Sequence, residues 1–233
     1  MCELFGAVLN NGGCPNTLEK FRYFALQNPD GWGIAWYTKR KLHLEKSIKS
    51  AWWDTKYQAT LRNVKSKLIL AHLRKMSIGN IREVNTHPFI FGKYVFAHNG
   101  SVDVRPLVEY LKGKYKQIKG TTDSEVLFHF IIQNMEKWGN FMGLRKAVKE
   151  INKVTKERKV TSINFLMTDG RYLYAYKRNY RGKNNLYFKK KGGFNKYLLF
   201  SSKPIEHGWT ELENGELMVV DSLDLSVIRT KIL

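Results

Sequence analysis

The order of the predicted secondary structure constrains the fold of this chain more than any other feature. Strand patterns dominate the first hundred residues, helix patterns the middle, and strand patterns return from about residue 160. The regular alternation of strands and helices seen in a dinucleotide-binding fold is absent. This order predicts an α+β protein in which two antiparallel sheets are flanked or separated by layers of helices.

The individual elements follow from apolar periodicity and turn residues. Strands are predicted at Glu3–Leu9, Trp32–Tyr37, Leu42–Ile48, Lys67–Arg74, Lys93–Ala97, Val160–Met167, Arg171–Lys177, Leu186–Lys190, Tyr197–Ser201 and Glu216–Val220. Helices are predicted at Thr17–Gln27, Asp54–Lys65, Val104–Leu111, from Thr122 onward, and at Asn140–Val154. Thr122 and Glu125 have the spacing of a capping box. No repeat or linker interrupts the chain, so we expect one domain over residues 2–233.

Composition excludes several classes of protein. The chain has 233 residues with 43% hydrophobic and 26% charged residues, which are globular proportions. No apolar run approaches the roughly 20 residues of a membrane span, and no secretory signal is present at the N-terminus. Two cysteines cannot form a disulfide framework. If one of them, Cys2, is catalytic, it must stay unpaired, which suits a reducing compartment, so a cytoplasmic location is expected.

The charge is unusual, with 40 basic against 20 acidic residues and a net charge of +20. Such a field attracts polyanions, and the segment from Arg171 to Pro204 holds ten basic residues and no acidic ones, interleaved with Tyr and Phe. A nucleic-acid-binding surface is therefore one hypothesis. The alternation in Arg171–Tyr176 is also typical of a half-buried strand, and we favour a solvated face.

Cys2 is the first candidate for chemistry. A start methionine before a small residue is the arrangement that aminopeptidases remove, which would leave a thiol and a free α-amine on one residue. An α-amine titrates near pH 7.7–8.0 and a thiol near 8.5, so the amine can take the thiol proton. The alternative is an ordinary small apolar residue at the start of a strand.

Polar residues at strand ends supply further candidates. Asn99-Gly100 fits either a type I′ hairpin turn or an oxyanion hole made by the Asn99 amide and the Gly100 N–H. Arg74 can grip a carboxylate, and Asp123 either stabilises a helix start or pairs with a substrate ammonium group. His72, His87 and His98 match no common ligand spacing, so no metal site is expected.

These segments, in this order, resemble the class II glutamine amidotransferases, which are N-terminal-nucleophile hydrolases, and more narrowly their stand-alone members. The resemblance spans Cys2 to about Val220. It rests on the following segments: Cys2-Glu3-Leu4-Phe5-Gly6, Asp30-Gly31-Trp32-Gly33, His72-Leu73-Arg74, Asn85-Thr86-His87-Pro88-Phe89, Ala97-His98-Asn99-Gly100, Thr122-Asp123-Ser124-Glu125, and Ser201-Ser202-Lys203-Pro204 before Trp209.

The resemblance implies a four-layer αββα sandwich and a set of roles. Cys2 would attack the γ-amide of glutamine or of a γ-glutamyl compound, with its α-amine as base. Asn99 and Gly100 would hold the oxyanion. The substrate's amino-acid headgroup would be bound by these residues: Arg74 at the α-carboxylate, Asp123 at the α-ammonium, and Ser77 and His87 shaping the pocket. No cofactor is implied.

Two departures from the family pattern bear on the substrate. Ser77-Ile78-Gly79 stands where many members read Thr-His-Gly, and Glu3 replaces an Arg of many bacterial stand-alone relatives. No synthase domain is expected within these residues. Ammonia would then pass to a separate synthase subunit or be released, or the substrate is another γ-glutamyl amide. The same chemistry on a different amide is a third hypothesis, although Arg74 with Asp123 complements a zwitterion.

Overall fold

The computed structural model describes residues 2–39, 41–77, 79–155, 160–181 and 184–232, and their strands form two antiparallel sheets. The first sheet has the order β11-β9-β10-β1-β4-β2-β3. Its strands are β1 (Glu3–Leu9), β2 (Trp32–Thr38), β3 (Lys41–Ser47), β4 (Leu68–Leu73), β9 (Tyr187–Lys191), β10 (Tyr197–Ser201) and β11 (Thr210–Glu211). The second has the order β13-β12-β8-β7-β6-β5. Its strands are β5 (Phe89–Phe91), β6 (Tyr94–Gly100), β7 (Ile163–Thr168), β8 (Tyr172–Lys177), β12 (Glu216–Asp221) and β13 (Val227–Lys231).

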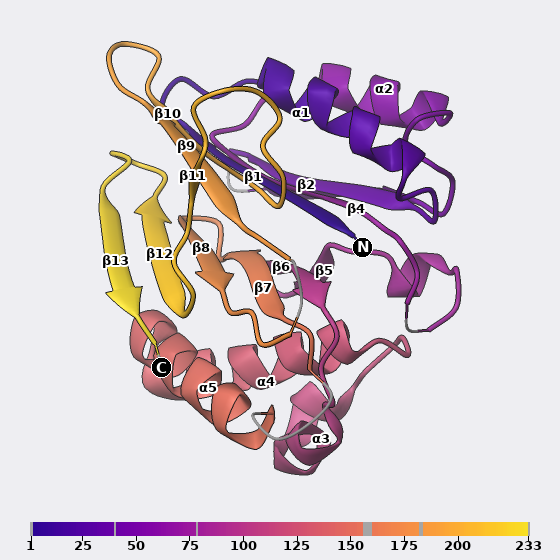
Figure 1. Ribbon diagram of the computed structural model, residues 1–233, viewed down its shortest axis with the longest axis vertical. Coiled ribbons are helices and arrows are strands. Elements are labelled where there is room, and N and C mark those ends of the chain that lie inside the picture. Colours follow the sequence, from indigo (N-terminus) through magenta and orange to yellow (C-terminus); the bar gives the residue numbers. More distant parts are fainter. Residues whose placement is uncertain (1, 40, 78, 156–159, 182–183, 233) are drawn as a thin grey trace.

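Helices cover the outer face of each sheet, which gives the four layers shown in Figure 1. On the first sheet lie α1 (Asn16–Phe21), a 3₁₀ segment (Arg22–Leu26) and α2 (Thr55–Asn63). On the second lie α3 (Arg105–Tyr110), α4 (Asp123–Trp138) and α5 (Asn140–Thr155). The expected αββα sandwich is thus confirmed. In the described part of the chain, no helix has the length and apolar character needed to cross a bilayer.

Strand β1 shows why the apolar runs of this sequence are nearly continuous. All seven of its residues are buried. Leu4 and Val8 belong to the core between the two sheets, whereas Phe5 and Ala7 belong to the core beneath α1 and α2. Because successive side chains of a strand point to opposite faces, a strand in a middle layer must be apolar on both.

The second sheet repeats this arrangement with α4 as its cover. On β6, Val95 lies in the core between the sheets and Phe96 in the core beneath the helices. The ring of Phe96 stacks on Phe128 of α4 with a centroid distance of 5.1 Å. The two middle layers are therefore fixed against each other and against their helices by three separate apolar cores.

Two of the predicted helices differ from the structure in detail. The helix expected at Thr17–Gln27 is α-helical only through Phe21 and continues as a 3₁₀ segment. Thr122 is the N-cap residue of α4, but its side chain makes no capping hydrogen bond. The Glu125 carboxylate instead accepts from the backbone N–H groups of Lys119 (2.9 Å) and Gly120 (2.7 Å). No capping box forms, because the preceding turn occupies the glutamate.

Gly33 provides a test of how closely the layers approach. A Cβ atom there would lie 2.2 Å from the carbonyl oxygen of His87. We expect Gly33→Ala to lower the free energy of unfolding by about 3 kcal/mol, because the backbone at His87 must move away. Urea denaturation measures this loss. Gly192→Ala is the control, since a Cβ there meets nothing within 4 Å and should change stability by less than about 0.5 kcal/mol. Equal effects would contradict the packing described.

Candidate active site

Cys2 lies directly before β1, beside the loop that follows β4. Its thiol donates to the carbonyl oxygen of Lys75 at 3.2 Å, and the Lys75 N–H donates to the sulfur at 3.3 Å. Burial raises the pKa of the Cys2 thiol, while the Lys75 N–H and the positive charge of Arg74 act in the opposite direction. Because the thiolate is the nucleophilic form, a base is needed to generate it here.

Asn99 connects Cys2 to the second sheet. Its side-chain Nδ2 donates to the Cys2 carbonyl oxygen at 2.6 Å. The amide has a second N–H, which this bond leaves unused. The Asn99 side chain is nearly fully buried, and its Oδ1 has no hydrogen-bond partner among the described residues. The end of β6 is thereby held against the start of β1.

Gly100 adopts a backbone conformation that other residues rarely reach. Its φ is 145°, and a Cβ atom would lie 1.9 Å from the carbonyl oxygen of Ser162. Asn99 and Gly100 both belong to β6 and pair with Asn164 and Ile163 of β7. The alternative of a type I′ hairpin turn is therefore wrong, since β6 continues through both residues and its partner lies some sixty residues away in sequence.

Arg74 follows β4 and is buried, with 3% of its surface exposed. Its backbone is clamped by the turn at Asp30-Gly31: Arg74 N–H donates to the Gly31 carbonyl, and Asp30 N–H donates to the Arg74 carbonyl. The Asp30 carboxylate also accepts from the Met76 N–H at 2.8 Å. The Arg74 side chain donates through Nη1 to the Asn80 carbonyl oxygen at 3.0 Å.

Asn85 ties this loop to the segment before α4. Its Nδ2 donates to the Asn80 carbonyl oxygen at 3.1 Å and to Thr121 Oγ1 at 3.2 Å. Its Oδ1 accepts from the Thr121 N–H at 2.9 Å. The side chain is 1% exposed. Sequence reasoning placed Asn85 in a family segment but gave it no role, and its buried amide is a connection that local sequence does not reveal.

Asp123 completes the set of connections at the start of α4. Its Oδ2 accepts from the Val102 N–H at 2.8 Å, and its Oδ1 accepts from the Ser124 N–H at 2.8 Å. Val102 follows the Asn99-Gly100 end of β6 by two residues. Hydrogen bonds and short chain segments therefore form a closed circuit through the following residues: Cys2, Lys75, Arg74, Asn80, Asn85, Thr121, Asp123, Val102 and Asn99.

The three histidines do not form a ligand set. The rings of His72 and His87 are stacked at a tilt, with centroids 4.3 Å apart, and His98 Nδ1 lies 3.0 Å from Ser124 Oγ. Burial lowers the pKa of all three, that of His72 to about 3, so they are neutral at pH 7. Among the described residues, no group of three or more potential ligands could hold a metal ion.

Ser77, which the family resemblance assigns to the substrate pocket, is exposed.

Glu3 has a defined environment, which sequence reasoning could not supply. Its carboxylate is 3% exposed and lies 2.7 Å from the ammonium group of Lys203. It also accepts a hydrogen bond from Ser202 Oγ at 2.5 Å, and this hydroxyl in turn accepts from the Leu4 N–H at 2.9 Å. Ser202 and Lys203 therefore hold the side chain of the residue that follows Cys2.

The comparisons with known proteins identify the family of this chain. The model of the family "Glutamine amidotransferases class-II" matches residues 1–201. The chain belongs to this family. An uncharacterised protein of Methanocaldococcus jannaschii is 30% identical, with 94% of this chain and 69% of that protein covered. A solved class II glutamine aminotransferase domain protein from Silicibacter pomeroyi has the same fold, with a TM-score of 0.73, 22% identity and full coverage of both chains.

Two further relatives carry functional names. The probable glutamine amidotransferase DUG3 of Saccharomyces cerevisiae is 30% identical over an aligned region that covers 61% of this chain and 49% of that protein. A γ-glutamyl-hercynylcysteine sulfoxide hydrolase of Mycobacterium tuberculosis is 35% identical over 79 residues, 34% of each chain. The chain thus matches members of the family over differing parts of their length.

Asn85 allows a test of the circuit. Asn85→Ala should lower the free energy of unfolding by about 1–3 kcal/mol, because the Thr121 N–H loses its acceptor and the Asn80 carbonyl keeps only its bond from Arg74. Thermal or urea denaturation measures the loss. Asn63→Ala, at an exposed position of α2, is the matched control and should change stability by less than about 0.5 kcal/mol. If the two variants are equally stable, the circuit contributes nothing.

Proposed function

We propose that this chain is a γ-glutamyl amide hydrolase that uses Cys2 as its nucleophile, with residues 2–233 acting as one catalytic domain. The observation that carries the proposal is the 2.6 Å bond from Asn99 Nδ2 to the Cys2 carbonyl oxygen. It sets an amide donor beside the thiol at the point where the two sheets meet. Family membership supplies the reaction class.

The proposed reaction begins at the thiol. Removal of Met1 frees the Cys2 α-amine, which takes the thiol proton and passes it to the leaving nitrogen. The sulfur attacks the γ-carbonyl carbon, and the C–N bond breaks to release ammonia or an amine. Water then attacks the γ-glutamyl thioester, which yields glutamate and restores the thiol. Asn99 Nδ2 and the Gly100 N–H would donate to the oxyanion of each tetrahedral intermediate.

The two proposed contacts to the substrate headgroup are made by members of the same circuit. The buried guanidinium of Arg74 would bind the substrate α-carboxylate, and the Asp123 carboxylate its α-ammonium group. Each charged group already makes a hydrogen bond to the backbone, the Arg74 guanidinium to the Asn80 carbonyl and the Asp123 carboxylate to the Val102 N–H. Charged groups that are fixed before the substrate arrives lose less entropy on binding. Ser77 and His87 remain proposed as residues that shape the pocket.

The substrate class is proposed from the relatives. The relative from Mycobacterium tuberculosis is named for a γ-glutamyl compound rather than for glutamine, and the one from Saccharomyces cerevisiae for glutamine amidotransfer. Both names fit a γ-glutamyl amide. A separate synthase subunit that accepts ammonia remains a proposed partner. A cytoplasmic setting is also proposed, and Cys2 and Cys14 are both free thiols.

The nucleic-acid hypothesis has less support. Four of the ten basic residues between Arg171 and Pro204 are paired with acidic residues from elsewhere in the chain. The pairs are Arg171 with Asp221, Lys177 with Glu211, Lys189 with Glu206 and Lys203 with Glu3. Compensated cations release fewer counterions from a phosphate backbone. A binding titration with RNA and DNA across salt concentrations tests this alternative.

The first prediction here concerns the nucleophile. Cys2→Ala should reduce glutamate release from glutamine and γ-glutamyl amides by about 10³-fold or more, because no other described group is proposed to form the thioester. A coupled assay for glutamate measures this. Cys14→Ala is the matched control and should retain activity, since Cys14 lies at the opposite end of β1.

The same experiment has a second readout. Intact-mass measurement of the active protein should show that Met1 is absent. Full activity in Cys2→Ala, or activity in protein that retains Met1, would refute the mechanism.

The second prediction concerns the pH dependence of the thiol. Since the positive charge of Arg74 lowers the pKa of the Cys2 thiol, Arg74→Gln should raise it. Only the thiolate reacts with iodoacetamide, so the alkylation rate rises with pH through this pKa, and the profile of Arg74→Gln should move to higher pH.

The measurement uses a Cys14→Ser background, so that only one thiol remains. Burial raises the pKa of Cys14 to about 11, and its removal eliminates any residual signal. Arg62→Gln, on the exposed surface of α2, is the control for the loss of one positive charge. Profiles that coincide for the Arg74 and Arg62 variants would show that Arg74 exerts no influence on the sulfur.

A further inference from the structure

A cavity of about 180 Å³ lies beside Cys2, on the side formed by the C-terminal half of the chain. Its lining includes Cys2 and Asn99 but neither Arg74 nor Asp123. It is therefore distinct from the proposed headgroup contacts. A water molecule, which is about the size of ammonia, needs only roughly 10–15 Å³ of such space. The cavity is more than ten times larger than the departure of ammonia requires.

We propose that this cavity is the subsite for the leaving amine, and that it takes an amine bearing a carboxylate, as in an amino acid joined to the γ-carboxyl of glutamate. This rests on the proposed function and adds the chemistry of the leaving group. Tyr187 and Lys203, which both line the cavity, would bind the carboxylate.

Two side chains in the lining, Tyr187 and Lys203, retain unused hydrogen-bond donors. The Tyr187 hydroxyl oxygen accepts from Asn185 Nδ2 at 3.0 Å, which leaves the hydroxyl proton to be donated. The Lys203 ammonium group has three N–H donors, more than its contact with Glu3 uses, and its side chain is 45% exposed. Both Glu3 oxygens are already engaged, one by Lys203 and one by Ser202. An acceptor such as a carboxylate therefore fits best.

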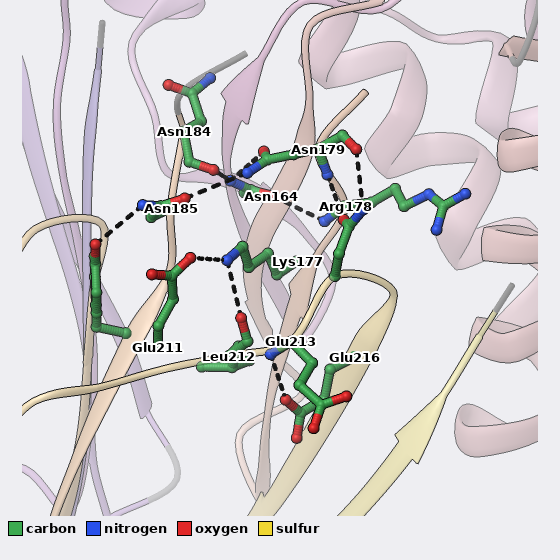
Figure 2. A network of polar contacts seen from close by, with 12 residues as sticks. Asn164, Lys177, Arg178, Asn179, Asn184, Asn185, Glu211, Leu212, Glu213 and Glu216 are labelled. Atoms are coloured by element: carbon green, nitrogen blue, oxygen red, sulfur yellow. Dashed lines mark hydrogen bonds and ion pairs between the residues drawn. The ribbon is translucent and has the colours of Figure 1, made fainter. Parts of the chain in front are cut away.

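The wall on the Tyr187 side of the cavity is fixed before a ligand binds. Asn164 of β7 donates through Nδ2 to the Asn184 carbonyl oxygen at 2.7 Å, and its Oδ1 accepts from the Arg178 N–H at 2.9 Å. Asn179 Nδ2 donates to Asn185 Oδ1 at 3.4 Å. Figure 2 shows Asn184 and Asn185 meeting Asn164 and Asn179 in this network. A preformed wall reduces the entropy lost on binding.

Lys177 of β8 lies next to this network (Figure 2). This side chain is only 6% exposed, and its ammonium group contacts the Glu211 carboxylate and donates to the Leu212 carbonyl at 2.9 Å (Figure 2). It is therefore committed to holding β8 against the segment around Glu211. Lys203, unlike Lys177, lines the cavity. The chain's net charge of +20 also raises the encounter rate with anionic substrates.

The test compares three substrates with the full-length, processed protein: glutamine, γ-glutamylglycine and γ-glutamylglycinamide. The last two have the same size and differ only in the charge of the leaving group. We expect kcat/KM for γ-glutamylglycine to exceed that for γ-glutamylglycinamide by about tenfold, because charge-assisted hydrogen bonds are about twice as strong as neutral ones. Glutamate release measures all three.

Variants assign the effect to the cavity. Tyr187→Phe and Lys203→Gln should each reduce the ratio of the two kcat/KM values severalfold, and Lys203→Arg should preserve it. Tyr37→Phe is the matched control, because the Tyr37 hydroxyl donates to the Lys93 carbonyl outside the cavity lining. It should leave the ratio unchanged. If Lys203→Gln fails to fold, Tyr187→Phe and the wild-type ratio still decide.

The outcomes separate this inference from the proposed function. Glutamate release from glutamine with a ratio at or below one for the two glycine compounds would overturn the inference and leave the proposed function intact. A ratio that neither Tyr187→Phe nor Lys203→Gln alters would also overturn it. Absence of glutamate release from all three substrates would end both.

Discussion

The packing of two sheets face to face is the constraint on which the rest of this structure depends. Leu4 and Val8 of β1 share one apolar core with Val95 and Ala97 of β6, so the ends of these two strands must lie close together. The bond from Asn99 to the Cys2 carbonyl is the polar contact made at that point. Burial of apolar area supplies the free energy that holds the two sheets together, and the hydrogen bond fixes the position of the Cys2 thiol relative to the Asn99 amide.

This dependence explains why so many polar groups at the site are buried. Arg74, Asn85 and Asp123 are each at most 8% exposed, and a buried polar group is costly unless it is paired. The bonds to Asn80, Thr121 and Val102 compensate that cost and at the same time hold the groups in place. The requirement for pairing thus produces a rigid frame from four segments that are distant in sequence.

The sequence was sufficient to predict the layers but not every contact within them. The apolar run at Glu3–Leu9 predicted a strand, and the structure has a strand there with all seven residues buried. The capping box at Thr122 failed because Glu125 had two backbone partners in the preceding turn, an interaction that spacing alone cannot rank. Asn85 was overlooked for a similar reason, since its partner Thr121 lies 36 residues away. Local patterns report propensity, whereas these choices depend on tertiary neighbours.

The burial that organises the site also sets a difficulty for its chemistry. It raises the pKa of the Cys2 thiol, and in the proposed mechanism a free α-amine on the same residue would be the base with the shortest path to that proton. Glu3 adds a negative charge one residue away, which would disfavour a thiolate further. Its pairing with Lys203 offsets this charge. Lys203 would therefore have two roles: it compensates Glu3 beside the proposed nucleophile, and it keeps hydrogen-bond donors for the proposed leaving group.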